Sequence, residues 1–218
     1  MSWSGFASAG AGVADPRTQP FLEWGVASRP FGGGPTSGDV AVVRVVRDVA
    51  LVAACDGLGH GVAAARAATA AAAVLDAFSG EDAVALARRC DEALRSTRGA
   101  ALSLAVFSAP VATLTWVGVG NVEGRLLRGN SSAPGAAVCL MPDVGIVGNG
   151  VAPTHPVTLP VERGDTLILA TDGVAGRFAD SVALVGTPQD IAGRILDEHG
   201  RPTDDALVLV ARYLGSRS

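Results

Sequence analysis

Two neighbouring helical segments interrupt a long series of short strand-like segments in this sequence of 218 residues. Most of the strand-like segments follow one another directly and are separated by turns rich in Gly, Pro, Asn and Asp. A doubly wound parallel sheet would instead require strands and helices to alternate. The order therefore predicts an α+β fold in which helices pack on stacked antiparallel sheets.

Apolar runs rich in β-branched residues define the expected strands, and runs of Ala and Leu define the expected helices. Strands are predicted at 22–28, 40–46, 49–54, 101–107, 111–119, 122–128, 137–141, 144–147, 157–161, 166–170 and 206–213. Helices are predicted at 62–78, 81–96 and 190–199, and the first should be largely buried because it has little polar surface. Hairpin turns are expected at 47–48, 109–110 and 118–121.

One hydrophobic core is expected, because 218 residues are slightly too few for two comfortable domains. Hydrophobic residues make up 49% of the chain and charged residues 17%, which is typical of a globular protein. Residues 1–20 are rich in Gly, Ala, Ser and Pro and are predicted to form a mobile N-terminal arm. Residues 21–215 are predicted to form a single domain, since no interior linker or fixed repeat divides them.

Charge and composition argue against several classes of partner. The net charge is −4 and no long Lys/Arg run is present, so nucleic-acid binding is not expected. No segment is long and apolar enough to cross a bilayer, and the N-terminus lacks the basic region of a secretory signal. We therefore expect a cytoplasmic monomer without a membrane partner. Cys55, Cys90 and Cys139 are far apart and are expected to be small buried hydrophobic residues.

Aspartates recur at the ends of predicted strands, beside glycine or other small residues. Asp39 precedes one strand, Asp56 follows the next, Asp172 follows the strand at 166–170, and Asp204 and Asp205 precede the last strand. Several carboxylates in one place repel one another, and a divalent cation removes that penalty. Mg²⁺ and Mn²⁺ bind through carboxylate, carbonyl and water oxygens, and a pair of such ions suits phosphate ester hydrolysis. The pattern indicates a metal-dependent hydrolytic site.

Each of these motifs has an ordinary alternative when it is taken alone. Asp-Gly is a common turn dipeptide, so Asp56-Gly57 and Asp172-Gly173 also suit plain turns. His60 suits either a proton donor or ligand, or a loop residue that shapes the glycine-rich turn, and the loop interpretation is favoured. The same glycine-rich segment could cradle a phosphate at a helix N-terminus, but it lacks the Lys-Ser/Thr of a P-loop. The coincidence of acids at several strand ends favours the metal site.

Five sequence blocks occur in a fixed order within residues 22–213. They are 37–39 (SGD), 54–61 (ACDGLGHG), 118–121 (GVGN), 163–174 (RGDTLILATDGV) and 203–210 (TDDALVLV). Together they resemble the metal-dependent protein phosphatases, the PPM or protein phosphatase 2C superfamily, in its SpoIIE-like branch. Any one block is weakly specific, whereas all five in order are highly specific.

This resemblance implies a four-layer αββα sandwich of two antiparallel sheets flanked by helices, with a metal site at one edge. It implies two Mn²⁺ or Mg²⁺ ions bridged by Asp56, with the carbonyl oxygen of Gly57 as a further ligand. Asp39 and Asp172 match the family's ligand positions. The resemblance also implies that a water activated by the metals attacks phosphorus in line, without a phosphoenzyme.

Some positions are less clearly matched. In the closing block Asp204 matches the ligand position, and Asp205 is kept as the alternative ligand. His60 is kept as a further possible ligand. The arginine that some larger members use to hold phosphate has no counterpart in a matching motif, and Arg29 is not assigned that role although it lies in the neighbouring stretch.

The short chain resembles the RsbX-type phosphatases, which reset the stress-signalling complexes called stressosomes. This implies a protein serine/threonine phosphatase whose substrate is a phosphorylated STAS-domain regulator of a stressosome or related partner-switching pathway. One alternative is an anti-sigma-factor antagonist phosphatase that directly controls a sigma factor. Another is a catalytically silent binding module of the same fold, against which the intact acids argue.

Overall fold

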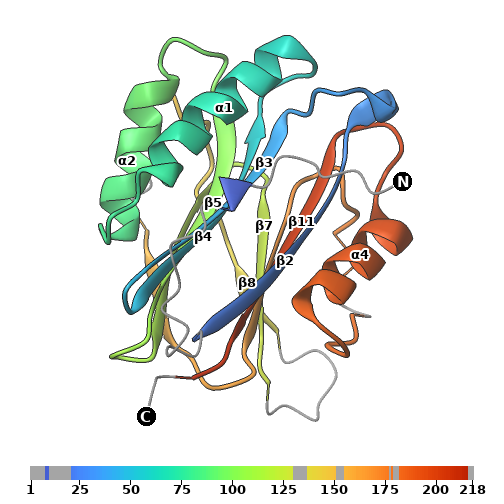
Figure 1. Cartoon of the computed structure of the whole chain (residues 1–218). Helices are drawn as coiled ribbons and strands as arrows, with labels where there is room; N and C mark the ends of the chain where they lie inside the picture. Colours follow the sequence, from blue (N-terminus) through green and yellow to red (C-terminus); the bar gives the residue numbers. More distant parts are fainter. Residues whose placement is uncertain are drawn as a thin grey trace.

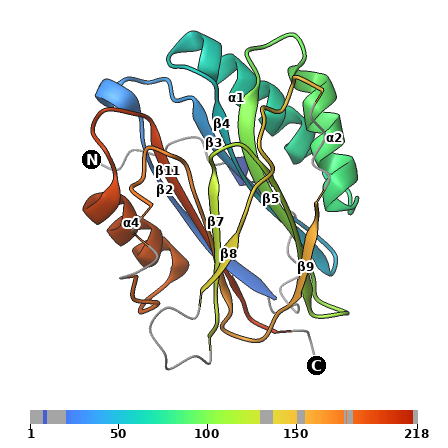
Figure 2. The same cartoon turned by 180° about the vertical axis from the view of Figure 1, so that it is seen from behind.

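The computed structural model describes residues 8–9, 21–129, 137–150, 155–176, 178 and 182–215. Two β-sheets face each other in the middle of the molecule (Figures 1 and 2). Helices α1 (Val62–Asp76) and α2 (Ala83–Leu94) cover the outer face of one sheet, and α4 (Pro188–His199) covers the outer face of the other. The predicted α+β sandwich with αββα layers is confirmed.

The first sheet has six strands in the order β1-β3-β4-β5-β6-β9. Their bounds are β1 (Ser8–Ala9), β3 (Asp39–Val46), β4 (Val49–Gly57), β5 (Ala100–Ser108), β6 (Thr113–Val119) and β9 (Val157–Pro160). Neighbours are antiparallel except β1 and β3, which pair in parallel. The predicted hairpin turn between β3 and β4 is confirmed, and Arg47 within it has a φ of 53°.

The second sheet has five strands in the order β2-β11-β10-β7-β8, and every neighbouring pair is antiparallel. Their bounds are β2 (Leu22–Arg29), β7 (Glu123–Leu127), β8 (Ala137–Leu140), β10 (Thr166–Ala170) and β11 (Ala206–Tyr213). A short 3₁₀ helix, η1 (Phe31–Gly33), follows β2. The last strand, β11, lies between β2 and β10, so the sheet pairs strands that are far apart in the sequence.

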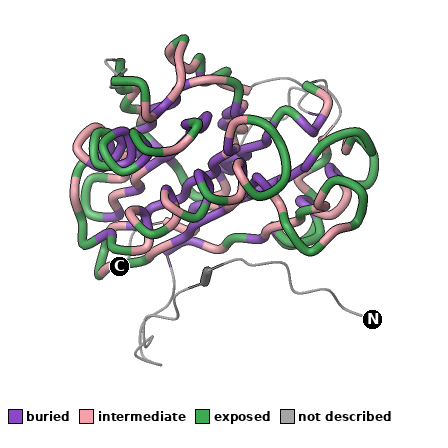
Figure 3. Tube along the Cα trace, turned by 90° about the horizontal axis from the view of Figure 1, so that it is seen from above, coloured by how far each residue is buried: buried purple, intermediate pink, exposed green. Residues whose placement is uncertain are grey.

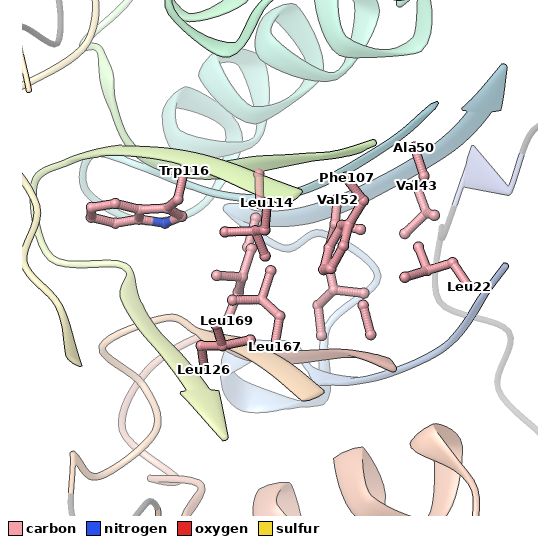
Figure 4. Close-up of a cluster of buried hydrophobic side chains, with 14 of the residues drawn as sticks. Leu22, Val43, Ala50, Val52, Phe107, Leu114, Trp116, Leu126, Leu167 and Leu169 are labelled. Carbon is pink, nitrogen blue, oxygen red and sulfur yellow. The ribbon is translucent and has the colours of Figure 1, made fainter. Parts of the chain in front are cut away.

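The central core lies between the two sheets. Figure 4 shows side chains of β4, β5 and β6 pointing toward side chains of β7 and β10. Trp116 is fully buried there, and its indole Nε1 donates a hydrogen bond to the hydroxyl of Ser103 at 2.7 Å. A buried indole N–H needs such a partner, because leaving it unpaired costs free energy. Apolar burial between the sheets thus fixes how one sheet lies on the other.

Two further cores lie beneath the helices, and buried residues follow the strands and the inward faces of the helices (Figure 3). Helix α1 buries only one face, through Ala64, Ala67, Ala68, Ala71 and Leu75, whereas Val62 is 82% exposed. The expectation that this helix is largely buried was therefore wrong. Its small residues let the helix backbone approach the sheet closely, but no further layer of the described residues covers its outer face.

The connection at 118–121 differs from the predicted hairpin. β6 belongs to the first sheet and β7 to the second, so this segment carries the chain from one sheet to the other. Gly120 has a φ of +92°, and a Cβ atom there would lie 2.7 Å from the Cβ atom of Ala101. The segment 144–147 is also not a strand, since it contributes only an isolated bridge between Val147 and Ala100. Local propensity does not reveal which sheet a strand joins.

Several smaller expectations have mixed outcomes. The short strand Ser8–Ala9 was not predicted, and the other residues of the predicted arm at 1–20 lie outside the described residues. Cys55 and Cys90 are buried as expected, whereas Cys139 is exposed, and all of them are free thiols. In the part of the chain that the structure describes, no helix has the length and apolar character needed to span a membrane.

We predict that Leu114→Ala lowers the free energy of unfolding by about 2–5 kcal/mol, because it leaves a cavity between the sheets. Leu114 is fully buried in that core. Urea unfolding followed by far-UV circular dichroism measures the change. The control Val144→Ala removes a side chain that is 97% exposed and should change the value by less than about 0.5 kcal/mol. Equal effects in the two variants would contradict this account of the core.

Candidate metal centre

The pairing of β3 with β4 sets the first two predicted ligands opposite each other. Asp39 begins β3, Asp56 lies next to the last residue of β4, and the two are direct partners in the strand register. Directly opposed residues in an antiparallel pair have Cβ atoms about 4.5–5.5 Å apart. The Gly57 amide donates to the Gly38 carbonyl at 2.9 Å and closes this end of the hairpin. Two of the predicted ligands therefore share one edge of the first sheet.

The second sheet reaches the same edge through Thr171, which follows β10. The Thr171 hydroxyl donates to the Asp39 carboxylate at 2.7 Å and accepts from the Leu207 amide at 2.9 Å. The Thr171 amide donates to the Leu207 carbonyl at 3.1 Å. This bond set joins β3 of one sheet to β11 of the other. It also brings Asp172, the next residue, close enough for its charge to act on both Asp39 and Asp56.

Asp204 and Asp205 have different surroundings although they are adjacent. Asp205 is only 6% exposed, and its carboxylate accepts the amides of Phe31 and Gly38, each at 2.8 Å. It thereby ties the connection between β2 and β3 to the start of β11. Asp204 is exposed, and its carboxylate accepts the Asp205 amide at 2.9 Å. Both oxygens of Asp205 are thus used inside the protein, whereas Asp204 faces solvent at the edge.

The two Asp-Gly pairs are places of close backbone approach. A Cβ atom at Gly57 would lie 2.1 Å from the Ala64 carbonyl oxygen, and one at Gly173 would lie 1.9 Å from the Asp205 carbonyl oxygen. Neither glycine has a positive φ. Glycine is therefore required at both positions by packing, since a side chain would collide with backbone atoms. The alternative of plain turns does not account for these contacts.

Burial and mutual repulsion hold protons on the central acids. Burial, and then the charge of Asp56, raises the pKa of Asp39 to about 8. Burial, and then the charges of Asp172, Asp204 and Asp205, raises the pKa of Asp56 to about 7. A hydrogen bond from Asp39 acts in the opposite direction on Asp56, as expected when opposed carboxyl groups share a proton. Burial, followed by the charge of Asp204, raises the pKa of Asp172.

The chemistry of this acidic cluster suits a hard divalent cation. Its donors are carboxylate oxygens, and the neighbouring charges that raise the pKa of Asp39 and Asp56 are other carboxylates. Across the described ranges, no three His, Cys, Asp or Glu side chains are arranged to hold a metal ion by themselves. Mg²⁺ commonly takes one or two protein carboxylates and keeps several waters. The residues at this edge fit an ion of that kind, which would also offset their repulsion.

Two other residues considered in the sequence do not join the acidic cluster. His60 is exposed in the turn before α1, and no hydrogen bond links it to the acids in the part of the chain with described placement. Arg29 lies against the end of α4, where a Cβ atom at Gly200 would be 2.5 Å from its Nη2 atom. That nitrogen is buried and has no hydrogen-bond partner among the described residues. Among the described residues, neither side chain is hydrogen-bonded to an acid of the cluster, and His60 as a ligand stays a prediction.

Sequence reasoning missed two residues that orient the acids. Thr171 holds Asp39, as described above, and the Asn121 amide nitrogen donates to the Asp172 carboxylate at 2.6 Å. Both residues stand inside blocks that were noted for their resemblance, at 163–174 and 118–121. Their position inside these blocks is the one signal that the sequence offers. The sequence does not reveal which acid each of these polar side chains contacts.

Comparisons with known proteins agree with this geometry. The family profile of Stage II sporulation protein E (SpoIIE) matches residues 47–214. The phosphoserine phosphatase RsbX of Bacillus subtilis (strain 168) is 26% identical over 142 residues, which is 65% of this chain and 69% of RsbX. The profile match covers well over half of the chain and includes Asp56, Asp172 and Asp204.

Solved structures extend the likeness to the whole sandwich. One chain, from work on the bacterial stressosome as a modular system adapted to control secondary messenger signalling, has a TM-score of 0.76 and 28% identity, covering 88% of this chain and 99% of its own length. The crystal structure of RsbX in complex with magnesium has a TM-score of 0.78 and 21% identity, covering 90% of this chain and 97% of its own length. The chain therefore belongs to the family of Stage II sporulation protein E, and it is similar in sequence and fold to RsbX.

Proposed function

We propose that this protein is a metal-dependent phosphatase that removes phosphate from serine or threonine residues of a partner protein. The observation that carries the proposal is the convergence of aspartates from both sheets at one edge, where burial and repulsion raise the pKa values of Asp39 and Asp56. Such a cluster is costly without a counter-charge. Family membership supports the same chemistry. We also propose that residues 21–215 form the single catalytic domain.

Asp56 would bridge two Mn²⁺ or Mg²⁺ ions, with the carbonyl oxygen of Gly57 as a further ligand. Asp39, Asp172 and Asp204 would supply the other protein oxygens. When bound, ions of this kind would act as Lewis acids toward the phosphate oxygens and would lower the pKa of a water held beside Asp56. The choice of Mg²⁺ is supported by the magnesium complex of RsbX, which shares the fold.

The chain's own residues prepare this site for a phosphate ester. Thr171 donates to Asp39 and Asn121 donates to Asp172, so a neutral side chain holds one oxygen of each acid in place. Asp205 holds the segment between β2 and β3 and thereby fixes the position of Gly38 beside Asp39. A preorganised carboxylate loses little freedom when it binds an ion, which favours tight binding.

The substrate we propose is a phosphorylated STAS-domain regulator of a stressosome or partner-switching pathway. RsbX is a phosphoserine phosphatase, and a similar chain comes from work on the bacterial stressosome. An anti-sigma-factor antagonist phosphatase would differ only in the pathway that its substrate controls. The acidic, monomeric protein would act in the cytoplasm, without nucleic acid or membrane as a partner.

We predict that Asp56→Asn lowers Mn²⁺-dependent hydrolysis of an aryl phosphate or a phosphorylated STAS protein at least about a hundredfold, because it removes the bridging carboxylate. The measurement is kcat/KM with saturating Mn²⁺. Asp197→Asn is the matched control, since Asp197 is an exposed acid on α4 and is not one of the acids of the cluster. Full activity in Asp56→Asn would refute the metal site. Absence of activity in the wild type with any divalent ion would instead favour a silent binding module.

We predict that Asp204→Ala and Asp205→Ala have different effects on stability and on metal affinity. Asp205→Ala leaves the amides of Phe31 and Gly38 without an acceptor, which should lower the free energy of unfolding by about 1–3 kcal/mol for each amide that stays buried. Asp204→Ala removes a charge that raises the pKa of Asp56, so it should not destabilise the metal-free protein. It should weaken Mn²⁺ binding in isothermal titration calorimetry. Urea unfolding in EDTA measures the stability of the metal-free variants. The prediction is contradicted if Asp204→Ala is the destabilised variant and Asp205→Ala the one with weaker Mn²⁺ binding alone.

The raised pKa values predict the sign of the pH dependence. Asp39 and Asp56 have pKa values of about 8 and about 7 in the folded protein, against about 3.9 for an unfolded aspartate. Between these values the folded state binds more protons than the unfolded state, so the free energy of unfolding falls as pH rises from about 4 to about 8.

Urea unfolding in EDTA at pH 5 and pH 8 measures this loss, and Asp39→Asn should make it smaller. Mn²⁺ binds the deprotonated acids, so the stabilisation that it gives should increase with pH. A loss of the same size in wild type and Asp39→Asn would show that other groups cause the dependence.

A further inference from the structure

The pairing of β4 with β5 continues beyond Asp56 and Gly57 and places one arginine opposite the loop that follows them. In the register of these strands Asp56 pairs with Ala101 and Gly57 with Ala100. The next bond follows the same ladder, since the Leu58 amide donates to the Gly99 carbonyl at 3.0 Å. Continued by one residue, this register sets Arg98 opposite Gly59. Arg98, in the turn between α2 and β5, therefore lies opposite the loop that directly follows Asp56 and Gly57.

The turn that carries Arg98 is held at several points. The Thr97 hydroxyl donates to the Leu94 carbonyl at 2.7 Å and accepts the Gly99 amide at 2.9 Å. Gly99 has a φ of +83°, and a Cβ atom there would lie 2.4 Å from a methyl carbon of Ile146. These contacts fix the backbone on both sides of Arg98. The direction in which its side chain leaves the turn is therefore set by the fold.

The guanidinium group of Arg98 lies across the surface of Gly59. A Cβ atom at Gly59 would be 2.7 Å from the Nη1 atom of Arg98, so the absence of a side chain at position 59 makes room for it. Arg98 is exposed, and within the described ranges it makes no ion pair with a carboxylate. An arginine that is not paired with a carboxylate keeps its donors available for another anion.

Other arginines near the edge are placed differently. The charge of Arg201 acts on Asp172 and opposes the rise in its pKa, although no ion pair joins these two residues within the described ranges. Arg29 has its Nη2 atom buried against the end of α4. Arg98 differs from both because its exposed guanidinium group lies over Gly59, in the loop that directly follows Asp56 and Gly57.

We propose that Arg98 binds the phosphoryl oxygens of the phosphoprotein substrate beside the metal centre; this inference rests on the proposed function. Four ionised acids, Asp39, Asp56, Asp172 and Asp204, carry the same amount of charge as two divalent ions. A phosphate dianion would then meet little net positive charge from the centre itself. The planar guanidinium supplies that charge and can donate two parallel hydrogen bonds to phosphate oxygens.

The test compares Arg98→Gln and Arg98→Lys with Arg88→Gln, which removes an exposed arginine in the middle of α2. Binding of inorganic phosphate to the Mn²⁺-loaded protein is measured by isothermal titration calorimetry, and kcat and KM are measured with an aryl phosphate. Arg98→Gln should weaken phosphate binding and lower kcat/KM by about tenfold to a hundredfold, the range of a lost charge-assisted hydrogen bond. Arg98→Lys should retain part of the phosphate affinity and part of kcat/KM, because lysine keeps the positive charge but cannot donate two parallel hydrogen bonds.

Mn²⁺ affinity, measured in the absence of phosphate, should be unchanged in all three variants, which separates phosphate binding from assembly of the metal centre. Phosphate binding in Arg98→Gln equal to that in Arg88→Gln would overturn the proposal, and so would a wild-type protein that binds Mn²⁺ but no phosphate. Failure of the phosphatase function itself is recognised separately, by full activity in Asp56→Asn or by no turnover in the wild type. Phosphate titration still tests Arg98 in that case.

Discussion

The hydrogen bond from Thr171 to Asp39 joins the two sheets at the edge where the acids meet, and the candidate metal centre depends on it. Each sheet alone carries only part of the cluster, with Asp39 and Asp56 on the first and Asp172, Asp204 and Asp205 at strand ends of the second. The buried apolar side chains between the sheets fix the distance across the sandwich. Thr171 then fixes the lateral position at the rim, because its hydroxyl also accepts from the Leu207 amide.

The cluster costs stability in the metal-free protein, and the rest of the fold offsets that cost. Burial and neighbouring carboxylates raise the pKa of Asp39 and Asp56, which means that ionising them in the folded state is unfavourable. Close packing beneath the cluster, at Gly57 and Gly173, leaves no room for the acids to move apart by a backbone shift. Because packing holds the carboxylates together in the folded protein, the metal-binding site is formed before any cation binds.

Much of the fold and the identity of the acids could be predicted from the sequence, because both follow from local patterns. The runs of β-branched residues gave the hairpin of β3 and β4, and the resemblance of five blocks pointed to Asp39, Asp56, Asp172 and Asp204. What could not be predicted depends on contacts between distant segments. The crossing at 118–121 looked like a hairpin, because its glycines suit either connection. The separate role of Asp205 depends on amides more than 160 residues away in the chain.

The position of β11 has a consequence for the synthesis of this protein. This strand is synthesised after every other strand that the structure describes, yet it lies between β2 and β10 and directly follows Asp204 and Asp205. The second sheet therefore lacks an interior strand until residues 206–213 emerge from the ribosome, and β2 lacks its described neighbour before then. A nascent chain that ends before β11 would have neither a complete second sheet nor a complete metal site.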